Sequence, residues 1–192
     1  MRTYFLFYFT AGLALLTTGC AGPEPKYRTD ATVKDIMDSV VDPNADYIWD
    51  AVSSDSSIKG LVEKAPKTDE DWKEVRRHAV SLMEAMNMLQ IPGRPVAHPG
   101  ERAADPRVEE PPEVIKTMID SDRESWIKYS NSLYDATALI LKAVEAKNVY
   151  GILDAGDRID QACETCHLKY WYPKQTLLLE KTKQSGSVRK TP

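Results

Sequence analysis

The fold is decided by residues 152–170, which read ILDAGDRIDQACETCHLKY. Apolar and cysteine side chains recur in this stretch at steps of three and four residues, which is the spacing of one face of an α-helix. The members of this stripe are Ile152, Ala155, Ile159, Cys163, Cys166 and Tyr170. The pattern predicts a helix that buries this face against other helices and ends before Pro173.

The stripe carries a C-x-x-C-H motif at Cys163, Cys166 and His167. On a helix these positions are i, i+3 and i+4, so the three side chains share one face. The motif is the attachment signature of c-type haem. The two thiols add across the two haem vinyl groups as thioethers, and the adjacent imidazole reaches the iron from the same side. We therefore predict one covalent haem c, with His167 as the proximal iron ligand.

Two other types of site share part of this motif. A thioredoxin-like C-x-x-C belongs in a βαβ setting, and no strand pattern precedes Cys163. A structural zinc site needs four ligands, and only His78 and His98 could complete one. With three cysteines and three histidines in 192 residues, chance produces C-x-x-C-H in roughly one such sequence in a thousand. Haem attachment is therefore the favoured interpretation.

The N-terminus reads MRTYFLFYFTAGLALLTTGC and predicts an export signal. Arg2 precedes an apolar run over residues 4–16, which is shorter than the roughly 20 residues that cross a bilayer. Small residues before Cys20 resemble the bacterial lipobox, in which cleavage precedes the cysteine and its thiol is diacylated. We expect a signal peptide at 1–19, lipidation at Cys20 and a polar tether at 20–29. The alternatives are an ordinary cleaved signal that leaves Cys20 as a free thiol, and cleavage further along the chain.

Three further helices are predicted between the tether and residue 152. The first covers residues 31–41 and is stopped by Pro43; a loop is expected from about 53 to 66. The second covers 68–89, and a proline-rich loop follows over 92–112. The third begins near Pro112 and carries apolar residues every seven positions, namely Ile119, Trp126, Leu133 and Ile140. The expected fold is all-α, an antiparallel four-helix bundle over residues 30–175 with a flexible tail at 176–192.

Four helices with C-x-x-C-H on the last one resemble the class II c-type cytochromes, which include cytochrome c′ and its low-spin relatives. Tyr170, three residues after His167, also matches this class, whereas Trp171 stands where the family usually has a basic residue. The resemblance implies that Tyr170 lies against the haem and that the first helix covers its distal side. Low-spin members place a methionine there, which implies that Met37 is the second iron ligand.

Other side chains could bind the iron or the haem propionates. The remaining methionines and histidines are interpreted as packing or surface residues: Met83, Met86, Met88, Met118, His78 and His98. Three cations could pair with propionates, and the sequence does not choose among Arg94, Arg123 and Lys169.

Composition limits the function further. A net charge of −4 and a pI near 5.5 argue against nucleic-acid binding, and three cysteines cannot form a disulfide framework. We see no pair of residues with catalytic spacing and expect no enzyme activity. The expected function is electron transfer by a periplasm-facing lipoprotein in either bacterial membrane, with redox proteins as partners. The alternative is a five-coordinate haem protein of the cytochrome c′ kind that binds NO or CO. A homodimer stays open, because many members of the family dimerise through their first two helices.

Overall fold

The computed structural model of the protein describes residues 26–57 and 60–175. Within these ranges the fold is all-helical apart from one antiparallel hairpin, which confirms the all-α prediction. In chain order the elements are α1 (Val33–Ile36), η1 (Met37–Val41), α2 (Asp42–Ala51), β1 (Ser53–Ser57), β2 (Gly60–Lys64), α3 (Asp69–Leu89), α4 (Pro112–Ser121), α5 (Arg123–Glu145) and α6 (Val149–Tyr170).

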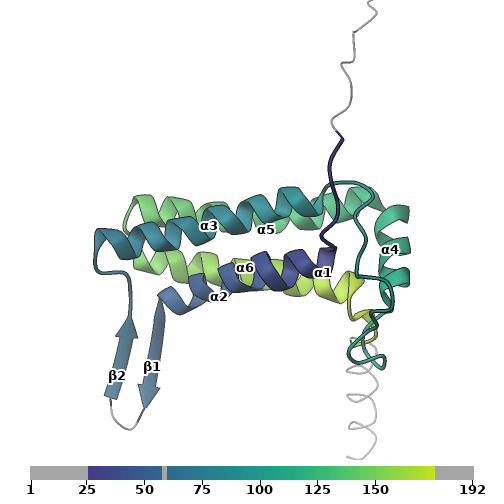
Figure 1. Ribbon diagram of the computed structural model, residues 1–192. Helices are drawn as coiled ribbons and strands as arrows, with labels where there is room; N and C mark the ends of the chain where they lie inside the picture. Colours follow the sequence, from purple (N-terminus) through teal and green to yellow (C-terminus); the bar gives the residue numbers. More distant parts are fainter. Residues whose placement is uncertain (1–25, 58–59, 176–192) are drawn as a thin grey trace, which may run out of the picture.

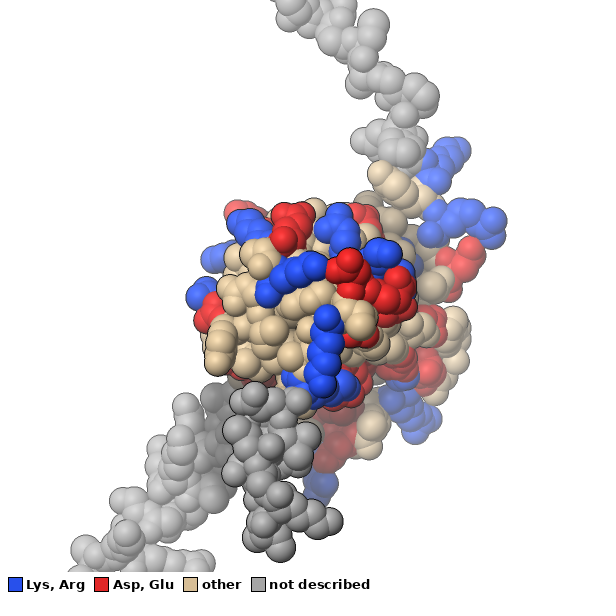
Figure 2. Space-filling view, turned by 90° about the vertical axis from the view of Figure 1, so that its left-hand side faces the viewer, with Lys and Arg blue, Asp and Glu red and all other residues tan. Residues whose placement is uncertain are grey.

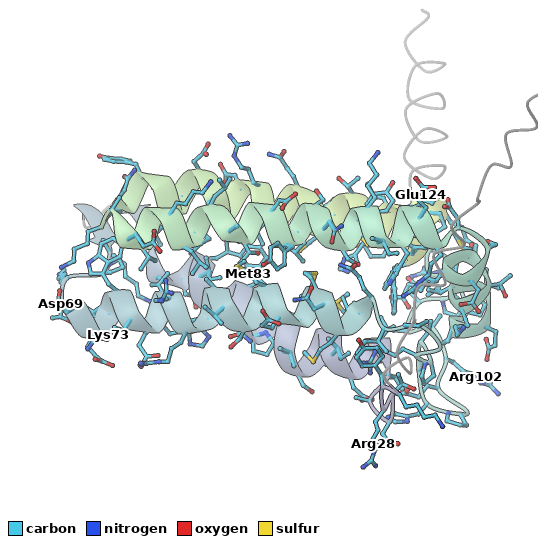
Figure 3. All side chains as sticks on the ribbon, turned by 90° about the horizontal axis from the view of Figure 1, so that it is seen from above. Arg28, Asp69, Lys73, Met83, Arg102 and Glu124 are labelled. Atoms are coloured by element: carbon cyan, nitrogen blue, oxygen red, sulfur yellow. The ribbon has the colours of Figure 1, made fainter. Side chains whose placement is uncertain are left out.

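Within the described residues, the long helical segments lie side by side as rods that alternate in direction (Figure 1). The first rod is α1, η1 and α2, which follow one another without a break; the other three are α3, α5 and α6. In Figure 1, α3 and α5 form one layer, and the first rod and α6 form the other. Helix α4 lies across one end of the rods. Figure 3 shows the length of α3 from above, with Asp69 and Lys73 at one end and Arg28 and Arg102 beyond the other.

Each rod buries one apolar stripe between the layers. Ile48, Leu82, Ile140 and Ile159, one from each rod, are completely buried. Trp126 donates from Nε1 to the Leu89 carbonyl oxygen at 2.9 Å, which satisfies an acceptor that the end of α3 leaves free. At the end where α5 turns into α6, Lys, Arg, Asp and Glu side chains are interspersed (Figure 2).

The prediction that Pro43 ends the first helix is wrong, because the rod continues to Ala51. The segment before the proline is a π-helix, in which the Asp42 N–H bonds the Met37 carbonyl oxygen five residues back. A proline inside a helix has no N–H to donate, and its ring presses on the carbonyl four residues earlier. The wider π-turn gives that ring room, so the chain keeps its direction.

Two further predictions are corrected. The third helix is broken at Asp122, whose φ of −137° and ψ of 65° are not helical. The Asp122 side chain accepts from the Ser125 N–H at 3.1 Å and caps α5, so Ile119 belongs to α4 instead. Part of the loop expected from 53 to 66 is the β1–β2 hairpin.

Some predictions fall on parts of the chain that the structure does not describe. The signal peptide at 1–19, the lipidation at Cys20, the first part of the tether and the tail at 176–192 all lie outside the described residues. Within the described ranges, no helix combines the length and the apolar character needed to cross a membrane.

His78 joins the first rod to α3. Its ring stacks on Tyr47 with centroids 3.8 Å apart, and its Nδ1 lies 2.7 Å from Asn44 Oδ1. Asn44 donates its amide N–H to the Val40 carbonyl oxygen at 2.6 Å, which turns Oδ1 toward the imidazole. The amide oxygen can only accept, so His78 Nδ1 carries a hydrogen. Burial lowers the pKa of His78, and the Arg77 charge lowers it further.

This environment predicts a pH dependence of stability. Because the pKa of His78 is lower in the folded chain than its ordinary 6.5, the unfolded chain binds more protons below that pH. The free energy of unfolding therefore falls as pH is lowered through about 6.5. In the variant His78→Gln we expect this part of the slope to disappear, as measured by urea denaturation between about pH 8 and about pH 5. Identical slopes in the two proteins would contradict the assignment.

Candidate functional site

A cavity of about 260 Å³ lies between the four rods and brings the predicted site residues together. Cys163, Cys166 and His167 line it from α6, and Met37 lines it from η1. Most of the remaining wall is apolar or aromatic, and includes Val41, Ala45, Trp49, Met86, Leu89, Trp126, Tyr129, Leu133 and Ala162. Four residues singled out in two distant parts of the sequence therefore line one cavity.

The two cysteines are free thiols that face this cavity. Burial raises the pKa of each thiol to about 12, and the charges of Asp160 and Asp42 add to the effect at Cys163. Catalytic cysteines of C-x-x-C oxidoreductases instead have a pKa lowered to between about 3.5 and 7.5. The environment of this motif thus argues against the thioredoxin-like alternative.

His167 has one of its two ring nitrogens engaged. Nδ1 lies 3.1 Å from the Tyr172 hydroxyl, which donates its own hydrogen to Glu164 Oε2 at 3.2 Å. Burial lowers the pKa of His167, while the charges of Asp42 and Glu164 act in the opposite direction. The neutral imidazole is the form that binds metals, and Nε2 is the nitrogen left for a ligand.

Tyr172 is a site residue that sequence reasoning missed. The N–H groups of Trp171 and Tyr172 both bond the His167 carbonyl oxygen, at 2.8 and 3.0 Å. This tight closure turns the chain back at the end of α6, so the Tyr172 ring lies edge-on to the imidazole at 5.6 Å. Helical periodicity gives no direction for a side chain beyond the helix end. Glu164 could have been found, because it lies three residues before His167 on the same helix.

The first rod forms the other wall of the cavity. The lining residues from this rod follow one another at steps of four, one, three and four residues: Met37, Val41, Asp42, Ala45 and Trp49. Asp42 directly follows the η1 π-turn, and π-turns of this kind are frequent at functional sites. At the far end of this wall, Trp49 Nε1 donates to the carbonyl oxygen of Gly156 at 3.1 Å, joining α2 to α6.

Gly156 makes room for this contact. A Cβ at that position would lie 3.3 Å from Trp49 Cδ1, which is closer than ordinary van der Waals contact. The missing side chain thus allows the indole to lie on α6 beside the cavity.

Two of the methionines in the described residues line the cavity. Met37 is half-buried and Met86 is fully buried, and both line the cavity. The cavity lining does not include Met83, Met88 or Met118.

The histidines outside the motif have other partners. His78 is held by Asn44, and Nε2 of His98 pairs with Asp35 at 2.9 Å. Neither lines the cavity. Among the described residues, no group of three or more His, Cys, Asp and Glu side chains is arranged to hold a metal ion directly.

Tyr170 lies behind the cavity wall. It is 1% exposed and packs edge-on against Trp126 and Tyr129, with ring centroids at 5.2 and 5.8 Å. Both of those rings line the cavity, but Tyr170 does not. Its hydroxyl is buried without a hydrogen-bond partner, and burial raises its pKa to about 12. Tyr170 therefore supports the aromatic wall from outside.

The three cations considered for propionates are engaged elsewhere. Arg94 donates to the carbonyl oxygens of Met88 and Ala31 at 3.1 and 2.6 Å, and Arg123 donates to that of Gln90. Lys169 lies 3.9 Å from the carboxylate of Asp122. None of the three lines the cavity.

Instead, the charged residues that line the cavity are acidic. Asp42, Asp160 and Glu164 belong to its wall, and we call these three the acidic rim. Burial raises the pKa of Asp42; the charge of His167 lowers it, and those of Asp38 and Asp46 raise it. The aspartates of the first rod therefore lie close enough to repel one another.

Comparison of the chain with models of known families, with curated proteins and with solved structures found no match.

Proposed function

We propose that the protein is a monohaem c-type cytochrome that transfers electrons, built as a four-helix bundle of the class II kind. The observation that carries the proposal is the shared cavity. Both thiols and the imidazole of C-x-x-C-H line it together with Met37, a thioether from a rod more than a hundred residues away in sequence. On this view Cys20 carries lipid, so the protein is a periplasm-facing lipoprotein of a bacterial membrane.

The residues of the cavity fit a haem. Two half-buried thiols stand i, i+3 on α6, a neutral imidazole follows, and the wall is mostly apolar and aromatic. A bound haem supplies a one-electron iron couple, whose potential depends on axial ligands, hydrogen bonds and burial. Cys163 and Cys166 would hold the group, and His167 Nε2 would bind the iron. The aromatic wall would keep water away from it.

Between the two sulfur candidates we propose Met37 as the second ligand. Met86 is part of the fully buried core of α3, at 1% exposure, where its side chain has packing partners. Met37 is half-buried and begins the π-turn, so it has room to move toward a bound group. Thioether ligation would fill the sixth position of the iron, which suits electron transfer because no site is left for a substrate.

Covalent attachment is the first test. We expect the mature protein, produced in a bacterium that matures c-type cytochromes, to carry one haem that survives denaturation. Mass spectrometry should show one haem and an acylated Cys20, and Cys163→Ser with Cys166→Ser should abolish the haem adduct. Cys20→Ser removes the lipidation site and leaves C-x-x-C-H intact, so it serves as the matched control for haem attachment. Haem-free wild-type protein under these conditions would refute the proposal.

The second test identifies the sulfur ligand. Met37→Leu and Met86→Leu keep side-chain volume and remove the thioether, with an expected stability cost below about 1.5 kcal/mol each. We expect Met37→Leu to convert a low-spin iron to a high-spin one in the visible absorption spectrum and Met86→Leu to leave it low-spin. The reverse result would make Met86 the ligand.

A five-coordinate haem that binds NO or CO is the second candidate. The observation that favours it is that the residues beside Met37 at the cavity are mostly apolar. A high-spin wild-type spectrum that shifts readily with carbon monoxide would select this function over electron transfer.

The acidic rim indicates the kind of redox partner. Carboxylates at the cavity attract positive charge, so we propose partners that present Lys and Arg around their own redox centre. Such interfaces are transient and sensitive to ionic strength.

This charge preference can be measured with inorganic reagents. We expect a cationic complex to exchange electrons with the protein faster than an anionic one, with a preference that decreases as salt is added. Asp42→Asn and Asp160→Asn should each reduce the preference at low salt, and together by at least about threefold. Asp69→Asn is the matched control, since Asp69 lies at the end of α3 and pairs with Lys147 at 2.6 Å. An equal effect of the control would mean that total charge, not the rim, sets the preference.

A further inference from the structure

His167 is the first member of a continuous chain of hydrogen bonds on the surface side of the cavity. The chain runs from His167 Nδ1 to the Tyr172 hydroxyl at 3.1 Å and from that hydroxyl to Glu164 Oε2 at 3.2 Å. The C-x-x-C-H motif requires neither Tyr172 nor Glu164: Glu164 occupies a variable position within it, and Tyr172 lies outside it.

The directions of these bonds follow from their chemistry. An ionised carboxylate can only accept, so the single hydroxyl hydrogen of Tyr172 goes to Glu164. The tyrosine oxygen then accepts from His167, whose Nδ1 must carry the hydrogen. This fixes one tautomer of the imidazole and leaves the lone pair on Nε2.

Tertiary contacts hold Tyr172 in this position. The Trp171 carbonyl oxygen accepts from the Glu110 N–H at 2.8 Å, and Lys174 Nζ lies 3.2 Å from both the Glu109 carbonyl oxygen and Glu110 Oε2. The residues on both sides of Tyr172 are thus fixed to the segment that precedes α4. Tyr172 is held by its neighbours as well as by its own hydrogen bonds.

We propose that Tyr172 and Glu164 are positioning residues that orient His167 and increase the electron donation of its Nε2. The proposal rests on the proposed haem function. A metal-bound histidine that donates its other N–H toward a carboxylate is a stronger ligand with a fixed ring orientation. We call the hydrogen-bonded chain His167–Tyr172–Glu164 the relay. Stronger electron donation by the histidine stabilises the oxidised iron, so the relay lowers the reduction potential.

The test is a double-mutant cycle on the haem-loaded, full-length protein. Tyr172→Phe keeps the aromatic ring and removes the hydroxyl, and Glu164→Gln keeps the shape and removes the charge. We expect each variant to shift the oxidation equilibrium toward the reduced form by about tenfold, which is 59 mV for one electron. In the Tyr172→Phe background, Glu164→Gln should shift the oxidation equilibrium by much less than tenfold, because the relay is already broken.

If the Glu164 charge acted on the iron only through space, the double-mutant cycle would show no coupling between the two substitutions. Glu164→Gln would then shift the potential equally with and without the tyrosine hydroxyl, and that result would overturn the relay. Asp160→Asn is the matched control, because Asp160 lines the same cavity and has no part in the chain. Its effect should be independent of Tyr172→Phe.

A spectroscopic readout separates orientation from simple packing. In wild-type protein we expect the His167 ring N–H signal in the NMR spectrum to exchange slowly with solvent, and in Tyr172→Phe we expect it to exchange faster. Unchanged exchange in the variant would overturn the relay. Haem content is measured first by mass spectrometry, so that failure of the proposed function and failure of the relay can be distinguished. Protein without haem refutes the proposed function. Protein that carries haem but shows no coupling between Tyr172→Phe and Glu164→Gln refutes the relay alone.

Discussion

Burial of the α6 stripe against the other rods is the interaction on which the structure depends. In its first half the stripe closes completely, since Ile152 and Ile159 are 1% and 0% exposed. In its second half Cys163 and Cys166 are only half-buried, because the same face opens into the cavity. One helix face therefore provides both the apolar area that holds the rods together and the groups that line the site. Because both parts share one periodicity, the motif cannot turn away from the interior unless the core of α6 turns with it.

Parts of this arrangement could be predicted from the sequence because they follow from local periodicity. The spacing of apolar residues predicted the bounds of α3 and α6 to within a few residues. The i, i+3, i+4 spacing predicted that Cys163, Cys166 and His167 share one face of α6. Met37 was selected only through a family resemblance, and the structure places it at the cavity. Met86 from α3 lines the same cavity.

The features that the sequence did not predict are those in which two local rules compete. Pro43 by itself predicts a helix end, but the helix continues through it after a π-turn, and no residue pattern predicts that turn. Asp122 interrupts a good heptad, because its side chain caps the following helix. Tyr172 lies beyond the last helical turn, so its position depends on contacts with residues 109 and 110 that are distant in sequence.

The proline-rich segment between α3 and α4 explains how the two sides of the cavity are kept in register. At one end of it, the Pro95 and Val96 carbonyl oxygens accept from the Val33 and Lys34 N–H groups, which satisfies the first donors of the rod that carries Met37. At its other end, Glu110 donates to the Trp171 carbonyl oxygen just after His167. Side-chain packing alone allows neighbouring helices to slide, whereas backbone hydrogen bonds fix a residue register. The segment therefore acts as a strap that joins the start of the first rod to the end of α6. A loop of this length would be an entropic burden in a simple helical bundle, and its contacts give it a structural reason to exist.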